Sequence, residues 1–445
     1  MVYLLFFCLL VGLILSYYLT GKNLLSAWVL SHIMFLISVS VVIINIDYFA
    51  TDISFITVVV ILMSLFFFGV GEISVRLLLF PKSKIKYPNL ESLNEIIVSK
   101  KKIVLSSLVI LFVLFYNYNK FIEIGSQMGG QNFITSYALV RTYAVSIENG
   151  EPLIQGISSN HLMDFLNIFV KVLVYMYMYI FLYNLIFFRK RKLIYFLPVL
   201  LYIPIMILGT TRSTFIQFIA FIAIIAFIMY KQKHYGWQSS KSNTNIAKYG
   251  SIFLLVFMVI FMALGTMKRE KGEAYTMDSA VEFTSGYIGA SIIGLDKYLN
   301  TEPLRHSDFP GQRTLDGVVS IVRKLGFNLP TAQYHQVDFT WKNGHSNIYA
   351  SPYYLILDFS YLGLVISRFF WGFVLGYVIA RFKYGYNNVH NGAVYVISSL
   401  LYYPIFMIAI SEEFGNFIGA AFLYEIVFIL FCQKMLIGKN DKVSQ

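Results

Sequence analysis

The sequence predicts an all-α polytopic membrane protein with about 11 transmembrane helices and two large extracytoplasmic loops. Of its 445 residues, 58% are hydrophobic and only 13% are charged, and the mean hydropathy is +0.67. That composition leaves too little polar surface to cover a soluble globule of this size. The apolar runs recur at roughly the 20 residues that a helix needs to cross about 30 Å of hydrocarbon, so they predict helices rather than barrel strands.

The apolar runs define the expected spans along one integral membrane domain, residues 1–445. The first run lacks a basic leader and a small-residue cleavage site, so we expect it to be a retained span rather than a signal peptide. The spans are expected near residues 2–19, 24–45, 53–71, 103–119, 165–188, 193–209, 213–230, 249–267, 356–380, 392–411 and 416–433.

Basic clusters occupy alternate connections between these spans, and the acidic residues are concentrated in the others. By the positive-inside rule the basic connections are cytoplasmic, which places the N-terminus outside and the C-terminus inside. Orientation signals and anionic-lipid contacts then account for the net charge of +12 without a nucleic-acid partner. The basic connections are residues 76–102, 189–192, 231–248, 381–383 and 434–442.

Two of the outer loops are long, at residues 120–164 and 268–352. Loops of this length usually form binding surfaces or lids. Within the second loop, residues 280–299 and 314–325 have helical apolar spacing, which predicts short amphipathic helices that lie flat on the membrane or cover a cavity. An alternative places an extra span at residues 283–298, although that segment is short, glycine-rich and carries Asp296.

Arginine is enriched over lysine on the outer side, where orientation does not require it. A guanidinium matches a phosphate bidentately and stays charged, so the outer arginines suit a phosphate or diphosphate ligand. The alternative is that each pairs with an outer acid. Arg212 is the most specific candidate, because in the turn 209–214 Ser213 or Thr214 can cap the following helix and leave free amides beside the guanidinium.

Arg368 lies about two turns inside its expected span, where an arginine costs at least about 2.5 to 3.5 kcal/mol. It should therefore face a polar cavity or an acid. Asp358 marks the outer mouth of the same span, and Glu412 and Glu413 at the end of the next span are plausible partners. A purely structural ion pair is the alternative.

His345 is the first candidate for a general base. It lies just before the span that carries Asp358, and a histidine there can take a proton from a sugar hydroxyl near neutral pH. No DxD, HExxH, CxxC or Walker-type motif is present, so we expect no metal site. Other candidates for the base are His306, His335, Asp358, Glu412 and Glu413.

Several of these features together resemble one family. Arg141 in the first large loop, the Gly209-to-Arg212 turn, and Gly-His-Ser-Asn at 344–347 followed by Asp-Phe-Ser-Tyr-Leu-Gly at 358–363 are similar to the Wzy-type polymerases of O-antigen and capsular oligosaccharide repeat units. The layout matches along the whole chain, whereas the sequence matches in short patches. Asp-Phe-Ser stands here where the family pattern has Asp-Phe-Gly.

The resemblance implies a glycosyltransferase-C-like fold and a metal-independent glycosyltransferase that needs no cofactor. Its substrate would be an undecaprenyl-diphosphate-linked oligosaccharide at the outer face of a bacterial cytoplasmic (inner) membrane, and its partners a flippase and a chain-length regulator. An O-antigen ligase and a lipid-linked oligosaccharide flippase or transporter remain as alternatives. The expected catalytic residues are His345, Arg212 and Arg368, and the expected substrate-binding residues are Arg141, Arg313, Arg323, Asp358 and Glu412.

Overall fold

The computed structural model describes residues 1–50, 52–148, 160–237, 239, 241–252, 286–301, 303–329, 338–342, 344–385 and 389–438. Within these residues the chain is mostly helical, as predicted. Eight described helices are long and apolar enough to cross a bilayer. They are α1 (Val2–Leu19), α2 (Ala27–Ile44), α4 (Phe55–Leu79), α5 (Lys100–Gln127), α7 (His161–Phe188), α9 (Arg212–Lys233), α14 (Ser351–Ala380) with its π-helical extension Arg381–Gly385, and α17 (Ala420–Cys432) with its extension Gln433–Ile437.

Two of the predicted spans correspond to shorter apolar helices, Leu193–Leu208 and Gly392–Met407. Residues 193–209 form a 3-10 turn (Leu193–Phe196) and the helix α8 (Leu197–Leu208). Residues 392–411 form two short helices, α15 (Gly392–Leu400) and α16 (Tyr403–Met407), because Pro404 in the first turn of α16 starts a new helix. The predicted span 249–267 lies mainly outside the described residues, so the total of about 11 spans stays a prediction.

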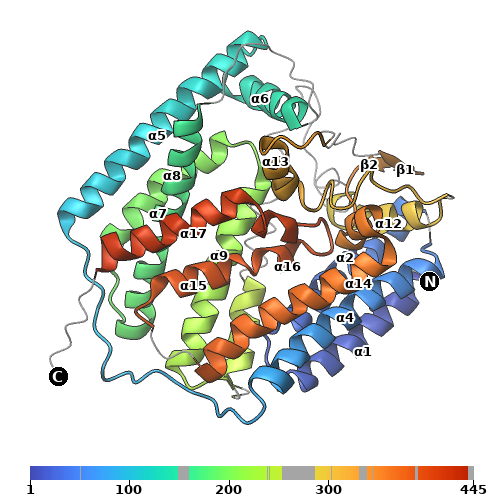
Figure 1. The fold of residues 1–445 in the computed structure, drawn as a ribbon, viewed down its shortest axis with the longest axis horizontal. Coiled ribbons are helices and arrows are strands. Elements are labelled where there is room, and N and C mark those ends of the chain that lie inside the picture. The colour runs from blue at the N-terminus through green and yellow to red at the C-terminus, as the bar shows by residue number, and fades with distance from the viewer. Residues whose placement is uncertain are drawn as a thin grey trace.

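The helices form two groups around a central set (Figure 1). The first group consists of α1, α2, α4 and α14, and the second of α5, α8 and the outer helix α6 (Phe133–Glu148). Helices α7, α9, α15, α16 and α17 lie between them (Figure 1). The central set therefore contacts both groups, for example through α7 against α8 and α16 against α2.

Helices α4 and α14 pack with their backbones in contact. A Cβ atom on Gly71 would lie 2.1 Å from the carbonyl oxygen of Phe369, and one on Gly372 would lie 2.0 Å from that of Phe68. Small residues allow such close approach, which maximises van der Waals contact where lipid offers no hydrophobic drive for association. This pair forms a rigid frame beside the outer loops.

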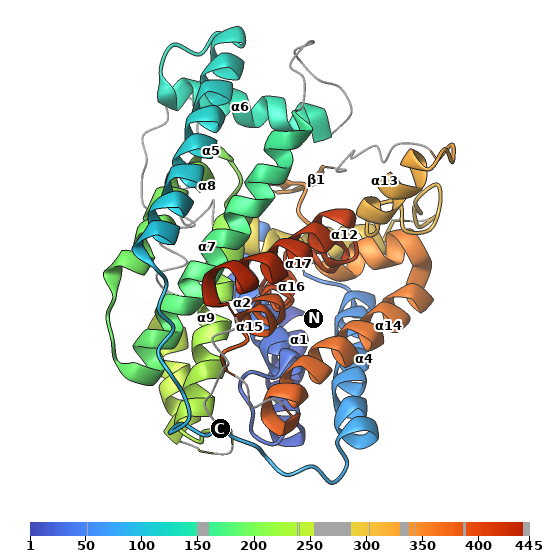
Figure 2. The ribbon, with the colours of Figure 1, turned by 60° about the vertical axis from the view of Figure 1, so that its left-hand side comes forward.

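The α14 ribbon is interrupted at Ser360, whose backbone has φ 60° and ψ −169°. That conformation is essentially reserved for glycine, so the serine holds it at a cost on the order of 1 to 3 kcal/mol. A Cβ on Gly363 would lie 1.9 Å from the Cβ of Phe359, which shows how tightly the chain folds back at this bend (Figure 2). The backbone at Ser360 is therefore of the kind that glycine adopts without strain.

The second outer loop folds over the ends of the spans. Its described elements are α12 (Ala290–Leu299), α13 (Asp316–Lys324) and the antiparallel strands β1 (Phe339–Trp341) and β2 (Gly344–Ser346). The two helices confirm the helical prediction for residues 290–299 and 316–324, whereas residues 280–285 lie outside the described part. However, α12 is buried rather than flat on a surface: Asp296 accepts hydrogen bonds from Ser54 and from the Thr57 hydroxyl at 2.7 Å, which caps α4.

Candidate functional site

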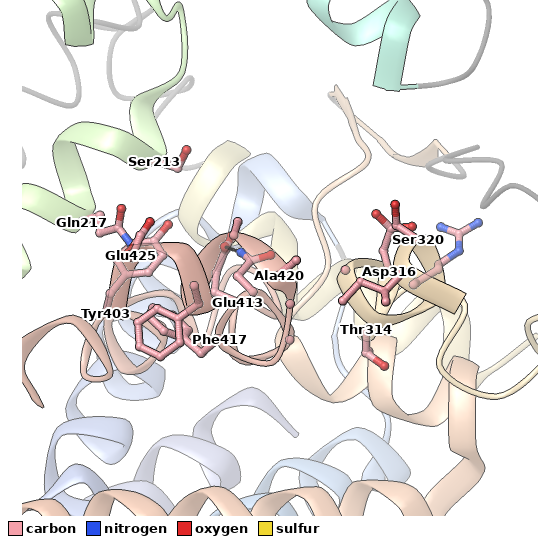
Figure 3. A pocket seen from close by; sticks show the side chains of 18 of the residues that line it. Ser213, Gln217, Thr314, Asp316, Ser320, Tyr403, Glu413, Phe417, Ala420 and Glu425 are labelled. Atoms are coloured by element: carbon pink, nitrogen blue, oxygen red, sulfur yellow. Dashed lines mark hydrogen bonds between the residues drawn. The ribbon is translucent and has the colours of Figure 1, made fainter. Parts of the chain in front are cut away.

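A polar cavity of about 510 Å³ lies where the central helices meet the second outer loop. Its walls come from the start of α9, from α13 and the residues before it, and from the connection between α16 and α17 (Figure 3). Ser213, Gln217 and Glu425 lie on one side of the cavity and Asp316 and Ser320 on the other (Figure 3). Hydroxyl, amide and carboxylate groups of this kind can hold the hydroxyls of a sugar.

Arg313 lines this cavity, and Asp358 fixes its position. The Asp358 carboxylate accepts hydrogen bonds from the backbone of Arg313 at 3.1 Å, from the backbone and hydroxyl of Thr314 at 2.7 Å, and from the Ser307 hydroxyl. These donors occupy the buried carboxylate, so Asp358 holds the loop before α13 in place. Asp358 does not line the cavity. The geometry therefore does not support the expected direct contact of Asp358 with substrate. It supports a role in positioning Arg313.

Arg212 is the first residue of α9, directly before the cavity-lining Ser213 and Thr214. It is buried, and its guanidinium lies 5.4 Å from the centre of the Tyr287 ring. Arg141 on α6 is within electrostatic range of Arg212. The expected cap by Ser213 or Thr214 is wrong: Thr211 is the N-cap residue, and its side chain makes no capping hydrogen bond.

Glu413 lines the cavity between its two sides (Figure 3). Its carboxylate accepts hydrogen bonds from the Ser411 hydroxyl at 2.9 Å and the Asn416 amide at 2.6 Å. Burial, together with the charge of Glu412, raises the pKa of Glu413 to about 7. Arg212, Glu413 and Arg141 are all within electrostatic range of the Tyr287 hydroxyl.

Arg368 and Glu412 form a buried ion pair, with 3.1 Å between the guanidinium nitrogen Nη2 and the carboxylate oxygen Oε2. The Ser351 hydroxyl bridges the two groups, and the backbone of Phe414 donates to the other oxygen of Glu412 at 3.1 Å. Neither charged residue lines the cavity. The structure therefore supports the ion-pair alternative for Arg368, and it places Glu412 as the partner of Arg368 rather than as a cavity ligand.

His345 is exposed on β2, opposite Thr340 of β1, and it does not line the cavity. The hairpin packs its Trp341 ring against Phe49 and Tyr48, with ring centres 5.4 and 5.9 Å apart. The role of His345 as a base stays a prediction without support from this geometry.

The remaining candidates are more dispersed. Arg323 on α13 lies 3.5 Å from the Asp316 carboxylate and does not line the cavity, so the alternative of pairing with an outer acid fits it. His306 is exposed, and His335 lies outside the described residues.

Sequence reasoning missed an ion pair in the cavity wall. Lys171 on α7 and Glu425 on α17 are 2.7 Å apart, and both line the cavity. The available signal was the pair of opposite charges within two apolar spans, because such residues usually face one another or a polar cavity.

Comparison of the chain with protein families, curated proteins and solved structures finds no match. The geometry of the site therefore carries the functional argument.

Proposed function

We propose that this protein is a polymerase of lipid-diphosphate-linked oligosaccharide repeat units, acting at the outer face of the cytoplasmic membrane in the orientation with the N-terminus outside. The observation that carries the proposal is a polar cavity of about 510 Å³ lined by Glu413, with Arg212 directly before two lining residues and 5.4 Å from the Tyr287 ring. Arg141 and Glu413 are within electrostatic range of the same ring. A glycosyl transfer from a lipid diphosphate needs fixed positive charge, an acid–base group and room for sugars, and this site combines the three.

In the proposed reaction, the acceptor hydroxyl attacks the anomeric carbon of the donor sugar. A carbon–oxygen bond forms there, the bond from the same carbon to the diphosphate oxygen breaks, and the lipid diphosphate leaves with the electron pair. Arg212 and Arg141 stabilise the negative charge that develops on this leaving group. Arginine suits the task because its guanidinium contacts two phosphate oxygens at once.

Glu413 is the base in this proposal, in place of His345. The carboxylate takes the proton from the acceptor hydroxyl, and a pKa of about 7 suits a general base near neutral pH. The two other carboxyl candidates are engaged elsewhere, Asp358 with the loop and Glu412 with Arg368. The polar wall, including Gln217, Ser320 and Asn416, would orient the sugar hydroxyls.

A transporter for the same lipid is the second candidate, and the Lys171–Glu425 pair is the observation that favours it. Intramembrane charge pairs often mark a substrate or ion path. Here, however, the pair opens into the same cavity as Glu413. An O-antigen ligase would use the same donor chemistry with a different acceptor.

Glycan analysis of a deletion strain tests these functions against one another. Loss of a polymerase leaves single repeats on the lipid carrier at the outer face, and complementation by the intact gene restores the polymer. Long carrier-bound polymer that is not attached to its final acceptor would indicate a ligase. Single carrier-bound repeats trapped on the cytoplasmic side would indicate a transporter.

A further inference from the structure

A second hollow, here called the α5–α8 groove, lies between the two helices for which it is named and measures about 580 Å³. Among the residues that the structure describes, its lining comes from these two helices and, at its edge, from Phe133 on α6, and almost every lining group is apolar. Phe115 and Tyr118 are 66% and 47% exposed, so the groove is open to its surroundings. Its lining residues are Leu111, Leu114, Phe115, Tyr118, Phe133, Pro204, Ile207 and Leu208.

The groove lies in the outer half of the bilayer in the proposed orientation. Leu111 and Tyr118 are about 16 and 27 Å along α5 from its basic end at Lys100, at 1.5 Å per residue. Leu208 ends α8 and directly precedes the turn that leads to Arg212. One end of the groove is therefore at the depth of the outer lipid headgroups, where α9 begins.

Aromatic side chains connect the groove to the arginines. Phe133 at its edge lies 6.3 Å from the Tyr137 ring, measured between ring centres. The charges of Arg212 and Arg141 both act on the Tyr137 hydroxyl. Tyr137, next to the outer end of the apolar groove, is thus within electrostatic range of the two positive charges to which the proposed function assigns a diphosphate.

We infer that the α5–α8 groove binds the polyprenyl chain of the lipid-linked donor and delivers its diphosphate to Arg141 and Arg212. This inference rests on the proposed function for the identity of the ligand. An amphiphile with a long unsaturated hydrocarbon and a diphosphate matches an apolar groove whose outer end, at Leu208, precedes Arg212 by four residues. The volume lies within the range of about 300 to 1,000 Å³ that is typical of ligand pockets.

The groove would orient the donor more than it attracts it. Lipid tails are as apolar as the groove, so the hydrophobic effect does not favour entry from the bilayer. Contacts between the chain and the rings of Phe115, Tyr118 and Phe133 instead fix where the chain lies. Blocking the groove should therefore raise KM for lipid-linked substrate and leave kcat largely unchanged.

Photocrosslinking tests the inference without catalysis. The full-length protein in nanodiscs would carry a photoreactive phenylalanine at position 115, or at position 105 as the control, since Leu105 is also exposed on α5 but lies nearer its basic end. We expect undecaprenyl diphosphate to crosslink at 115 and not at 105, and unlabelled undecaprenyl diphosphate to compete. Equal labelling at both positions, or equal competition by phosphatidylglycerol, would overturn the inference.

Kinetics give an independent test that also separates the two proposals. Leu114→Trp should raise KM for lipid-linked repeat units about tenfold, whereas Leu105→Trp should behave as wild type. If the wild type polymerises and Leu114→Trp keeps a normal KM, the groove inference fails alone. If position 115 crosslinks selectively but the wild type makes no polymer, the proposed function fails while the groove still binds a polyprenyl diphosphate.

Discussion

Two buried arginines, Arg368 and Arg212, lie in contrasting surroundings. Arg368 is fully buried and is neutralised by Glu412, with Ser351 bridging the pair. Arg212 faces an aromatic ring, has the like-charged Arg141 within electrostatic range, and directly precedes residues that line a cavity. A buried arginine matched to an acid stabilises the fold, whereas one placed beside another arginine and an open cavity is suited to an anionic ligand.

The largest expected effect is the loss of the protein from the membrane when the Arg368–Glu412 ion pair is broken. Arg368→Ala leaves the Glu412 carboxylate buried without its counter-ion, which costs about 3 to 5 kcal/mol. We expect the variant to be nearly absent from the membrane by immunoblot. Arg368→Met combined with Glu412→Gln removes both charges and should recover much of the protein, and exposed Arg76→Ala is the control. Normal accumulation of Arg368→Ala would contradict the structural role.

The opposite pattern is expected at Arg212. Arg212→Ala should accumulate normally and abolish polymer, because the leaving diphosphate loses its guanidinium partner. Arg212→Lys should retain activity only in part, since an ammonium keeps the charge but lacks the planar N–H donors that contact two phosphate oxygens at once. Polymer length on gels, normalised to membrane protein, measures both. Exposed Arg305→Ala in the second outer loop is the matched control, and full activity of Arg212→Lys would show that charge alone suffices.

Glu413 and His345 are alternative candidates for the general base, and their substitutions should have different effects. With a base of pKa about 7, kcat/KM should rise with pH up to about 7 and then level off. Glu413→Gln should lower the rate by about 10²- to 10⁴-fold and remove that rise. His345→Ala should stay close to wild type. If the Glu413→Gln enzyme still shows the rise of kcat/KM up to about pH 7, another group is the base.

The same pKa shift has a stability consequence with a definite sign. Because the folded state holds the Glu413 proton up to about pH 7 whereas an ordinary glutamate loses it near 4.5, this group favours unfolding progressively as pH rises between those values. Glu413→Gln should therefore flatten the dependence of the melting temperature on pH in that interval.

The smallest expected effect concerns the frame that holds the cavity. Ser360 adopts φ 60°, which a glycine tolerates without strain, so Ser360→Gly should stabilise the protein by about 1 kcal/mol. Ser360→Ala keeps the strain and should give no such gain. Thermal unfolding of both purified variants in detergent measures the difference, and a lower melting temperature for Ser360→Gly would contradict the strain.

The fold was largely predictable, because long apolar runs with basic ends report directly on spans such as α1 and α9. The site was predictable only in part. Sequence reasoning identified Arg212 and Arg141, but it could not distinguish Glu412 from Glu413, since the local backbone decides which of two adjacent carboxylates meets Arg368. It also placed His345 by proximity along the chain, whereas the hairpin packs Trp341 against the distant Phe49 and His345 does not line the cavity.

Chain elongation by the purified protein tests the central claim most directly. Wild-type protein in nanodiscs would be given lipid-diphosphate-linked repeat units in a buffer with a metal chelator, and the products would be resolved by length. We expect a ladder of polymer on the lipid carrier with the wild type, and unextended single repeats with Arg212→Ala and Glu413→Gln. Wild-type protein that leaves the repeats unextended, or an Arg212→Ala variant that produces the same ladder, would contradict the central claim.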